Sequence, residues 1–370
     1  MDSDLVLIIV VATALAFDFT NGFHDTANAV ATSISTRALS PKAAVLMSAV
    51  LNFVGAFVSL EVAATVAKGI VEADVITPTI VFGGLIGAIA WNLATWWFGL
   101  PSSSSHALIG GVVGAAFVAG GPSAILGDGL LEKVMIPALV APFLAFLVAG
   151  LSILIAYRII GHQRPGTVNR GYRLGQLVSG SLFSLAHGTN DAQKTMGIIT
   201  LALIAHGNLS SDHFEVPTWV VVSSATAIAL GTYSGGWRII RTMGSRIIKM
   251  DPAQGFSAQG TGAAVVLTAS HLGFPLSTTH SITGAVLGAG AGKRLSAVRW
   301  GLAGNIVVAW ILTLPAAAIV GALTYGLSRA FGTGALGPLL ISVALLGLMA
   351  AIFGQRLRRG PALTTSPADT

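Results

Sequence analysis

The chain has 370 residues; 54% of them are hydrophobic, and the mean hydropathy is +0.80. Only 9% are charged, whereas soluble proteins carry about 25%. A disordered chain is therefore excluded, and a soluble multidomain enzyme is disfavoured. The absence of cysteine excludes disulfides and thiolate-bound metals. These numbers indicate an all-α polytopic membrane protein.

Uncharged stretches divide the chain into predicted membrane segments, because a helix needs about 20 residues to cross the hydrocarbon core. Single crossings are predicted over 5–36, 43–66, 134–157, 176–205, 216–237 and 300–328, with an additional transmembrane helix over 335–354. A secretory signal is the competing interpretation of the first stretch, but Asp2 and Asp4 replace the basic region that a signal requires.

Two uncharged stretches, 75–127 and 252–292, are too long for one crossing at ~1.5 Å per residue. Each has a turn signal near its middle, at Pro101 and Pro275. The chain therefore enters and returns on the same side. We predict helical hairpins over 79–120 and 255–291.

The cationic residues orient the chain, because cytoplasmic loops are enriched in Lys and Arg. Sixteen of the 20 cations lie in loops that one path through the membrane places on the same side. This path predicts a multi-pass protein of the cell (plasma) membrane with its N-terminus outside and its C-terminus in the cytoplasm. The net charge of +6 is then a topology signal facing membrane lipid, and no nucleic-acid partner is expected.

On this path the two halves have the same elements in opposite orientations, which is an inverted-topology repeat. Residues 101–115 align with 275–289 with seven identities in fifteen, and Asp25 matches Asp191 at an offset of 166. We predict repeat 1 over 1–157, a basic cytoplasmic linker over 158–175, repeat 2 over 176–328 and a cytoplasmic tail over 355–370.

Two polar segments, 18–28 and 186–194, lie at membrane depth in the two repeats. An Asp or Lys at the centre of a membrane helix costs ~2.5–3.5 kcal/mol, so such residues usually mark an ion or substrate path. Gly22 and Gly188 precede the aspartates and favour a broken helix in each repeat. The alternative is a pair of interfacial loops. The charged candidates are Asp25, Asp191 and Lys194.

The hairpin turns carry hydroxyl groups at the N-terminus of each returning helix, where unpaired N–H groups and the helix dipole favour an anion. These residues are Ser103, Ser104, Ser105, Ser277, Thr278 and Thr279. Two such turns from opposite sides of the membrane could bind one tetrahedral oxyanion. Ordinary helix capping by Ser and Thr is the alternative.

Carboxylates beside an oxyanion must bind a cation or a proton, which provides a physical basis for coupled transport. Lys194 can pair with an Asp or with the anion, and His24, His106, His187 and His280 are candidate proton carriers. We expect His106 and His280 to support the hairpins. The chain has no H-E-x-x-H or G-x-S-x-G motif, so we predict no catalytic residues, no metal site and no enzyme activity.

These motifs resemble those of the inorganic phosphate transporter (PiT) family, and most of all its bacterial low-affinity branch. They are GFHDTAN at 22–28, GTNDAQK at 188–194, PSSSSH at 101–106 and PLSTTH at 275–280. The resemblance covers roughly residues 5–326. It implies inverted repeats, a homodimer, no cofactor, and inorganic phosphate as the substrate, in some relatives as a metal–phosphate complex, for example with Mg²⁺.

The resemblance also implies site roles. The expected phosphate-binding residues are the six hairpin hydroxyls with Asn190 and Lys194, and the expected coupling residues are Asp25, Asn28, Asp191 and His24. His24 and Lys194 replace asparagines of the family motifs. A fixed cation where sodium-coupled relatives have an amide oxygen favours proton over Na⁺ coupling. Sulfate stays open as an alternative substrate, and Na⁺ as an alternative coupling ion.

Overall fold

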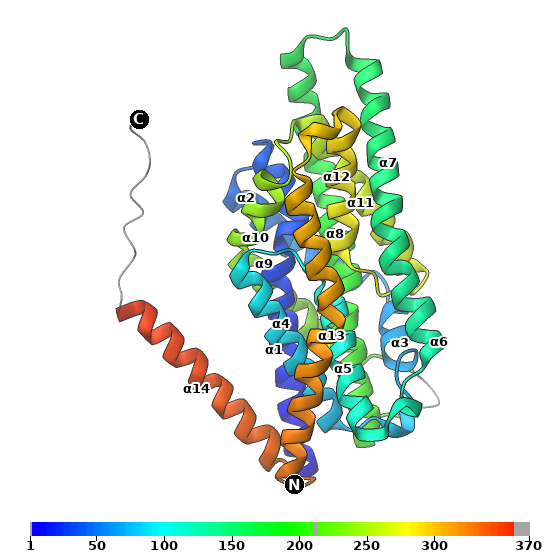
Figure 1. The fold of residues 1–370 in the computed structure, drawn as a ribbon, viewed down its shortest axis with the longest axis vertical. Helices are drawn as coiled ribbons and strands as arrows, with labels where there is room; N and C mark the ends of the chain where they lie inside the picture. The colour runs from blue at the N-terminus through cyan, green and yellow to red at the C-terminus, as the bar shows by residue number, and fades with distance from the viewer. Residues whose placement is uncertain (1, 211–213, 359–370) are drawn as a thin grey trace.

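A computed structural model describes the fold of residues 2–210 and 214–358, with side chains except at 2, 73, 160 and 348–358. The predicted tail over 355–370 lies largely outside these residues. Within them the chain is helical and forms no β-strand (Figure 1). The α-helices are α1 (Asp2–Ser35), α2 (Pro41–Gly55), α3 (Glu61–Lys68), α4 (Pro78–Phe98), α5 (Ser104–Gly120), α6 (Gly127–Leu130), α7 (Ile136–Ile160), α8 (Pro165–His206), α9 (Thr218–Ser234), α10 (Trp237–Arg241), α11 (Pro252–His271), α12 (Thr278–Lys293), α13 (Trp300–Ala330) and α14 (Leu336–Arg358). Two π-helical turns, η3 (Leu131–Met135) and η4 (Thr242–Arg246), and three 3₁₀ turns, η1 (Ala73–Val75), η2 (Pro122–Ala124) and η5 (Leu295–Ala297), join them.

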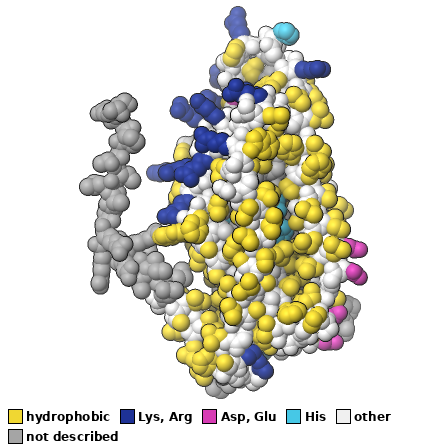
Figure 2. Space-filling model, in the orientation of Figure 1, with side chains coloured by type: hydrophobic (Ala, Val, Ile, Leu, Met, Phe, Trp, Pro, Cys, Tyr) yellow, Lys and Arg dark blue, Asp and Glu magenta, His cyan; other side chains and the backbone are white. Residues whose placement is uncertain are grey.

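The outer surface of the bundle is apolar. Among the described residues, four helical segments are long and hydrophobic enough to cross a membrane: Ser3–Ser35, Pro78–Phe98, Gly127–Ile159 and Trp300–Ala330. Figure 2 shows hydrophobic side chains along the length of one face, with Lys and Arg gathered toward the upper end and Asp and Glu toward the lower. Leucines and phenylalanines facing outward fit a lipid solvent, and the fold is that of a multi-pass membrane protein.

Each hairpin packs against the last long helix of the other half. The returning helix α5 lies on α13, and α12 lies on α7. Glycines permit both contacts. A Cβ added at Gly114 would lie 2.0 Å from the carbonyl oxygen of Ala318, and one at Gly288 would lie 2.0 Å from that of Phe146. Gly114 and Gly288 occupy aligned positions in the two hairpins, so the same close approach occurs twice.

The predicted breaks in the first helix of each repeat are wrong, because α1 and α8 run as continuous helices through Gly22 and Gly188. These glycines have a packing role. A Cβ at Gly22 would lie 2.3 Å from the carbonyl oxygen of Ile228 in α9, and one at Gly188 would lie 2.2 Å from that of Asn52 in α2. The small residues therefore let neighbouring backbones touch.

The predicted linker over 158–175 is also largely helical. Helix α7 continues to Ile160 and α8 begins at Pro165, where proline suits the first helical turn. The ends of both helices project beyond the rest of the bundle at the top of Figure 1. The polar residues of the predicted linker are therefore mostly exposed. In the second crossing, 43–66, the helix is interrupted between α2 and α3. Helix α14 starts beside α13 and then leaves the bundle (Figure 1).

We expect Gly288→Ala to destabilise the protein although alanine favours helix. The added methyl group must displace the α7 backbone, and overpacking of this kind costs about 1–3 kcal/mol. Gly304→Ala is the matched control, because no neighbouring helix or side chain lies within 4 Å of the Cβ position in α13. Thermal unfolding of the purified variants in detergent measures the effect. Equal stabilities of the two variants would contradict the close helix contact.

Candidate functional site

The tips of the two hairpins meet in the middle of the bundle. Ser103 and Ser277 cap the returning helices α5 and α12, since each hydroxyl oxygen accepts a bond from the backbone N–H three residues later, at 3.1 Å. Capping therefore accounts for these two hydroxyls, and their predicted contact with phosphate stays a prediction. The next two hydroxyls of each tip point to other partners.

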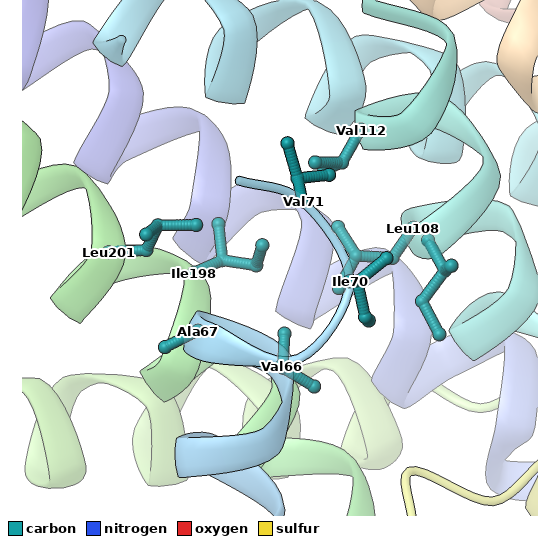
Figure 3. Close-up of a pocket in the computed structure, with 9 residues that line it drawn as sticks. Val66, Ala67, Ile70, Val71, Leu108, Val112, Ile198 and Leu201 are labelled. Atoms are coloured by element: carbon teal, nitrogen blue, oxygen red, sulfur yellow. The ribbon is translucent and has the colours of Figure 1, made fainter. Parts of the chain in front are cut away.

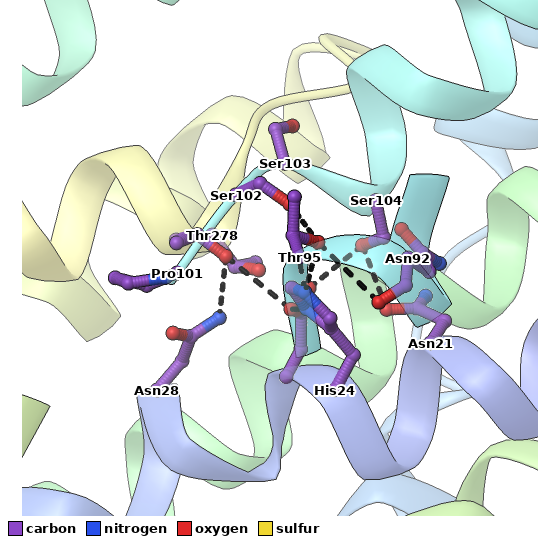
Figure 4. Close-up of polar contacts among 12 residues, drawn as sticks. Asn21, His24, Asn28, Asn92, Thr95, Pro101, Ser102, Ser103, Ser104 and Thr278 are labelled. Atoms are coloured by element: carbon purple, nitrogen blue, oxygen red, sulfur yellow. Dashed lines mark hydrogen bonds and ion pairs between the residues drawn. The ribbon is translucent and has the colours of Figure 1, made fainter. Parts of the chain in front are cut away.

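The Asp25 carboxylate on α1 accepts hydrogen bonds from hydroxyl groups of both hairpins. Ser104 donates to Oδ2 at 2.7 Å, and Thr279 donates to Oδ1 at 3.3 Å. One turn further along α1, the Asn28 amide donates to the Thr279 oxygen at 2.8 Å. Figure 4 shows Asn28 pointing from α1 toward the hairpin segments. The structure thus brings Asp25, Asn28, Ser104 and Thr279 together, and their predicted roles in binding phosphate and the coupling ion stay predictions.

Asp191 on α8 has an equivalent set of contacts. Thr278 donates to Oδ2 at 3.2 Å, and the Lys194 ammonium group donates to Oδ1. The same ammonium group donates to the Ser105 hydroxyl at 2.5 Å and to the carbonyl oxygen of Leu276 at 2.7 Å. Lys194 is only 1% exposed, so a buried positive charge lies between the aspartate and both hairpin tips.

The two sets of contacts correspond residue by residue. Ser104–Asp25 corresponds to Thr278–Asp191, because both members lie at the aligned positions of the two halves. Asn28–Thr279 corresponds in the same way to Lys194–Ser105. Each half therefore bonds its aspartate to its own hairpin and the residue three positions later to the opposite hairpin. Lys194 replaces an asparagine of the family motif. It keeps this contact with the opposite hairpin and adds a positive charge.

The residue before each aspartate contacts the end of the first helix of a hairpin. His24 Nδ1 lies 2.6 Å from Asp25 Oδ1, and His24 Nε2 lies 3.1 Å from the Thr95 hydroxyl at the end of α4. Asn190 donates to the Ser270 hydroxyl at the end of α11, at 2.8 Å. Asn190 is thus turned toward a helix end, and its predicted phosphate contact stays a prediction.

The carboxylates and one histidine form a compact buried cluster. One ligand atom each from Asp25, His187 and Asp191 lie within 4.8 Å of one another, and all three residues are buried. His187 Nε2 is 3.1 Å from Asp191 Oδ2, without the alignment of a hydrogen bond. Two carboxylates this close favour a shared cation or proton. Asp25 and Asp191 were expected to bind the coupling cation or proton, and His187 was named only as a candidate proton carrier; the structure adds its ring to the pair, and these roles stay predictions.

His106 and His280 stack between the hairpins. Their ring centroids are 4.8 Å apart, edge to face, and His280 stacks on Trp310 at 4.0 Å. The Trp310 indole N–H donates to the carbonyl oxygen of Pro101 at 3.1 Å. These contacts tie one hairpin to the other and to α13. The predicted role of His106 and His280 in supporting the hairpins agrees with these contacts and stays a prediction.

Several polar partners of the site were not predicted. The Ser104 hydroxyl also lies 2.8 Å from Asn21 Oδ1, and the Ser102 hydroxyl donates to Thr95 at 2.8 Å (Figure 4). Asn21 precedes Asp25 by four residues and so lies on the same face of α1, a spacing that could have identified it. Thr95 follows no motif, and only the hairpin geometry brings it to His24.

A hollow between α3, α5 and α8 is apolar and lies outside this site (Figure 3). Its lining is aliphatic, with Val66, Ile70, Leu108 and Ile198 among the side chains. An oxyanion would find no donor among these side chains, so this hollow is not a candidate phosphate site.

The fold and site define a class: a helical membrane transporter with a charged site enclosed by two hydroxyl-bearing hairpin tips. The chain belongs to the Phosphate transporter family, whose pattern matches residues 21–168 and 161–321. This is a family of transporters, not enzymes.

Known relatives agree with this assignment. A protein of Mycobacterium tuberculosis described as a probable low-affinity inorganic phosphate transporter is 54% identical over 356 residues, covering 96% of this chain and 85% of its own. A protein of Bacillus subtilis with the same description is 46% identical, covering 88% and 98%. A solved structure described as the sodium-dependent phosphate transporter matches with a TM-score of 0.75 and 25% identity, covering 88% of this chain and 99% of that one.

We expect Asp25→Asn and Asp191→Asn to abolish transport while the protein still reaches the membrane. Each substitution removes a charge that accepts hydroxyl bonds, and such bonds are worth ~1.5–3 kcal/mol each, so transport falls at least about tenfold. Asp128→Asn, at an exposed residue of α6, is the matched control. Uptake of labelled phosphate by cells, normalised to expression, measures the effect. Near-normal uptake by both site variants would refute the role of the carboxylates.

Proposed function

We propose that this protein is a secondary active symporter that imports inorganic phosphate across the plasma membrane, coupled to protons. The observation that carries the proposal is the reciprocal arrangement of Asp25 and Asp191, each bonded by hydroxyl groups of a hairpin tip. A site of this form holds an anion and the positive charge that accompanies it. Family membership supports phosphate as the anion.

The phosphate site is proposed at the two hairpin tips. The returning helices α5 and α12 begin there, so their N-terminal N–H groups and positive dipole ends face the same region. The hydroxyl groups of Ser104, Ser105, Thr278 and Thr279 can turn from the carboxylates and from Leu276 to phosphate oxygens. The Lys194 ammonium group supplies a fixed positive charge for the anion.

Coupling follows from the charges. Phosphate beside two carboxylates is repelled unless protons or cations neutralise them, so each ligand strengthens the binding of the other. Lys194 occupies the position equivalent to Asn28 and presents a cation where an amide oxygen would coordinate Na⁺. This substitution favours protons as the coupling ion. Sodium coupling, as in the solved relative's description, is the second candidate.

Alternating access is proposed to move the two hairpins against the two aspartate-bearing helices. We infer inverted repeats, because the corresponding contacts α5–α13 and α12–α7, and the corresponding hydroxyl bonds, relate the halves in pairs. The bonds that cross between halves, Asn28–Thr279 and Lys194–Ser105, would break as either side opens. An outer N-terminus, a cytoplasmic C-terminus and a homodimer belong to the same proposal.

Purified protein in liposomes tests substrate and coupling together. With Na⁺ absent and an acidic outer pH, labelled phosphate is expected to accumulate, and dissipating the pH gradient is expected to stop accumulation. Added Na⁺ should change nothing, and excess sulfate should not compete. Outer Mg²⁺ tests transport as a metal–phosphate complex. Loss of uptake without Na⁺ would contradict proton coupling, and full competition by sulfate would contradict phosphate selectivity.

A further inference from the structure

We propose that Asp18 is a proton-binding site of the transport cycle, a carboxyl group that carries one proton across with each phosphate. This inference rests on the proposed function and adds a residue outside the site contacts described above. Asp18 lies on α1 in the same polar segment as Asp25 but takes part in none of the hairpin bonds.

The helix geometry of α1 aligns Asp18 with the site. Seven residues separate it from Asp25, which is two helical turns, so both side chains lie on one face about 10 Å apart along the axis. Asn21 and Asn28 each follow an aspartate by three residues and complete the same polar stripe. The stripe therefore extends from the hairpin tips toward the N-terminal end of α1 and ends at Asp18.

The Asp18 carboxyl group is completely buried, and neither of its oxygens has a hydrogen-bond partner among the described residues. The Thr195 hydroxyl on α8 lies beside it without forming an aligned hydrogen bond. A bare carboxylate without donors in a low-dielectric interior is strongly disfavoured, whereas a protonated acid is tolerated. The group is therefore suited to hold a proton in this conformation.

Two charges act on Asp18, and both come from α8. Asp191 favours the protonated acid by repulsion, and Lys194 favours the carboxylate by attraction. The other helices that pack against α1 bring no further described carboxylate. Their ionisable side chains are Lys42, His106, Tyr233, Arg238, Arg241, Arg246, His271, His280 and Lys293.

This arrangement links the proton to the anion. When phosphate binds and pairs with the Lys194 ammonium group, the attraction of Lys194 for the Asp18 carboxylate is offset by the new negative charge. Protonation of Asp18 is then favoured, and by thermodynamic reciprocity a protonated Asp18 favours phosphate binding. The proton adds to one carboxylate oxygen from outer water and leaves as that O–H bond breaks toward inner water, with no change of oxidation state.

Asp18→Asn tests the proposal, because asparagine keeps the shape of the side chain and cannot carry the proton. Proteoliposomes with an internal pH dye and labelled phosphate report protons and phosphate together. We expect Asp18→Asn to lose about one proton per phosphate while phosphate exchange between the two sides persists. The exposed Asp128→Asn control should keep the wild-type ratio, and Asp18→Glu should restore proton coupling.

An unchanged proton-to-phosphate ratio in Asp18→Asn would overturn this inference alone. A wild-type protein that moves no protons with phosphate would instead contradict the proposed function. If Asp18→Asn does not fold, the infrared carbonyl band of protonated acid, recorded with ¹³C-labelled aspartate, decides the question. The band should be present in the wild type and weaker in Asp18→Glu by the contribution of one aspartic acid. Its absence from the wild type, or an unchanged intensity in Asp18→Glu, would overturn the inference.

Discussion

The burial of two aspartates side by side is the constraint on which the rest of this structure depends. Asp25 and Asp191 lie in a water-poor interior, where unpaired carboxylates are costly and like charges repel. Lys194 balances one of them, and hydroxyl groups from the hairpin tips bond to both. In the proposed coupling, a proton or a cation neutralises the remaining negative charge when the anion binds.

The helix packing places those hydroxyl groups next to the aspartates. A hairpin tip can end at membrane depth only if its polar backbone and side chains find partners inside the protein. The partners are aspartates on α1 and α8, and the hairpins are held in place by close glycine contacts with α13 and α7. The stacked rings of His106, His280 and Trp310 connect the same parts. These contacts hold the hairpins to the rest of the bundle, and in the proposed alternating access they would be exchanged for others as the site opens.

The sequence predicts those parts of the structure that leave a local signal in the residue types. Long uncharged stretches with a proline-hydroxyl turn indicate hairpins, and charged residues at membrane depth indicate the site. The breaks expected at Gly22 and Gly188 were wrong, because a glycine that unwinds a helix and one that admits a neighbouring backbone look alike in sequence. The neighbours, Ile228 and Asn52, lie far away along the chain. Thr95 was missed for the same reason: its partner His24 is 71 residues distant, and only the fold brings them together.

We propose that one phosphate binds between both hairpin tips and next to both aspartates. An experimental structure of the purified protein with phosphate, compared with one prepared without it, tests this most directly. We expect one tetrahedral density that appears only with phosphate and contacts hydroxyl groups of Ser104 or Ser105 and of Thr278 or Thr279, with the Lys194 ammonium group turned toward it. Density that contacts a single hairpin, or that lies away from Asp25 and Asp191, would refute this phosphate site.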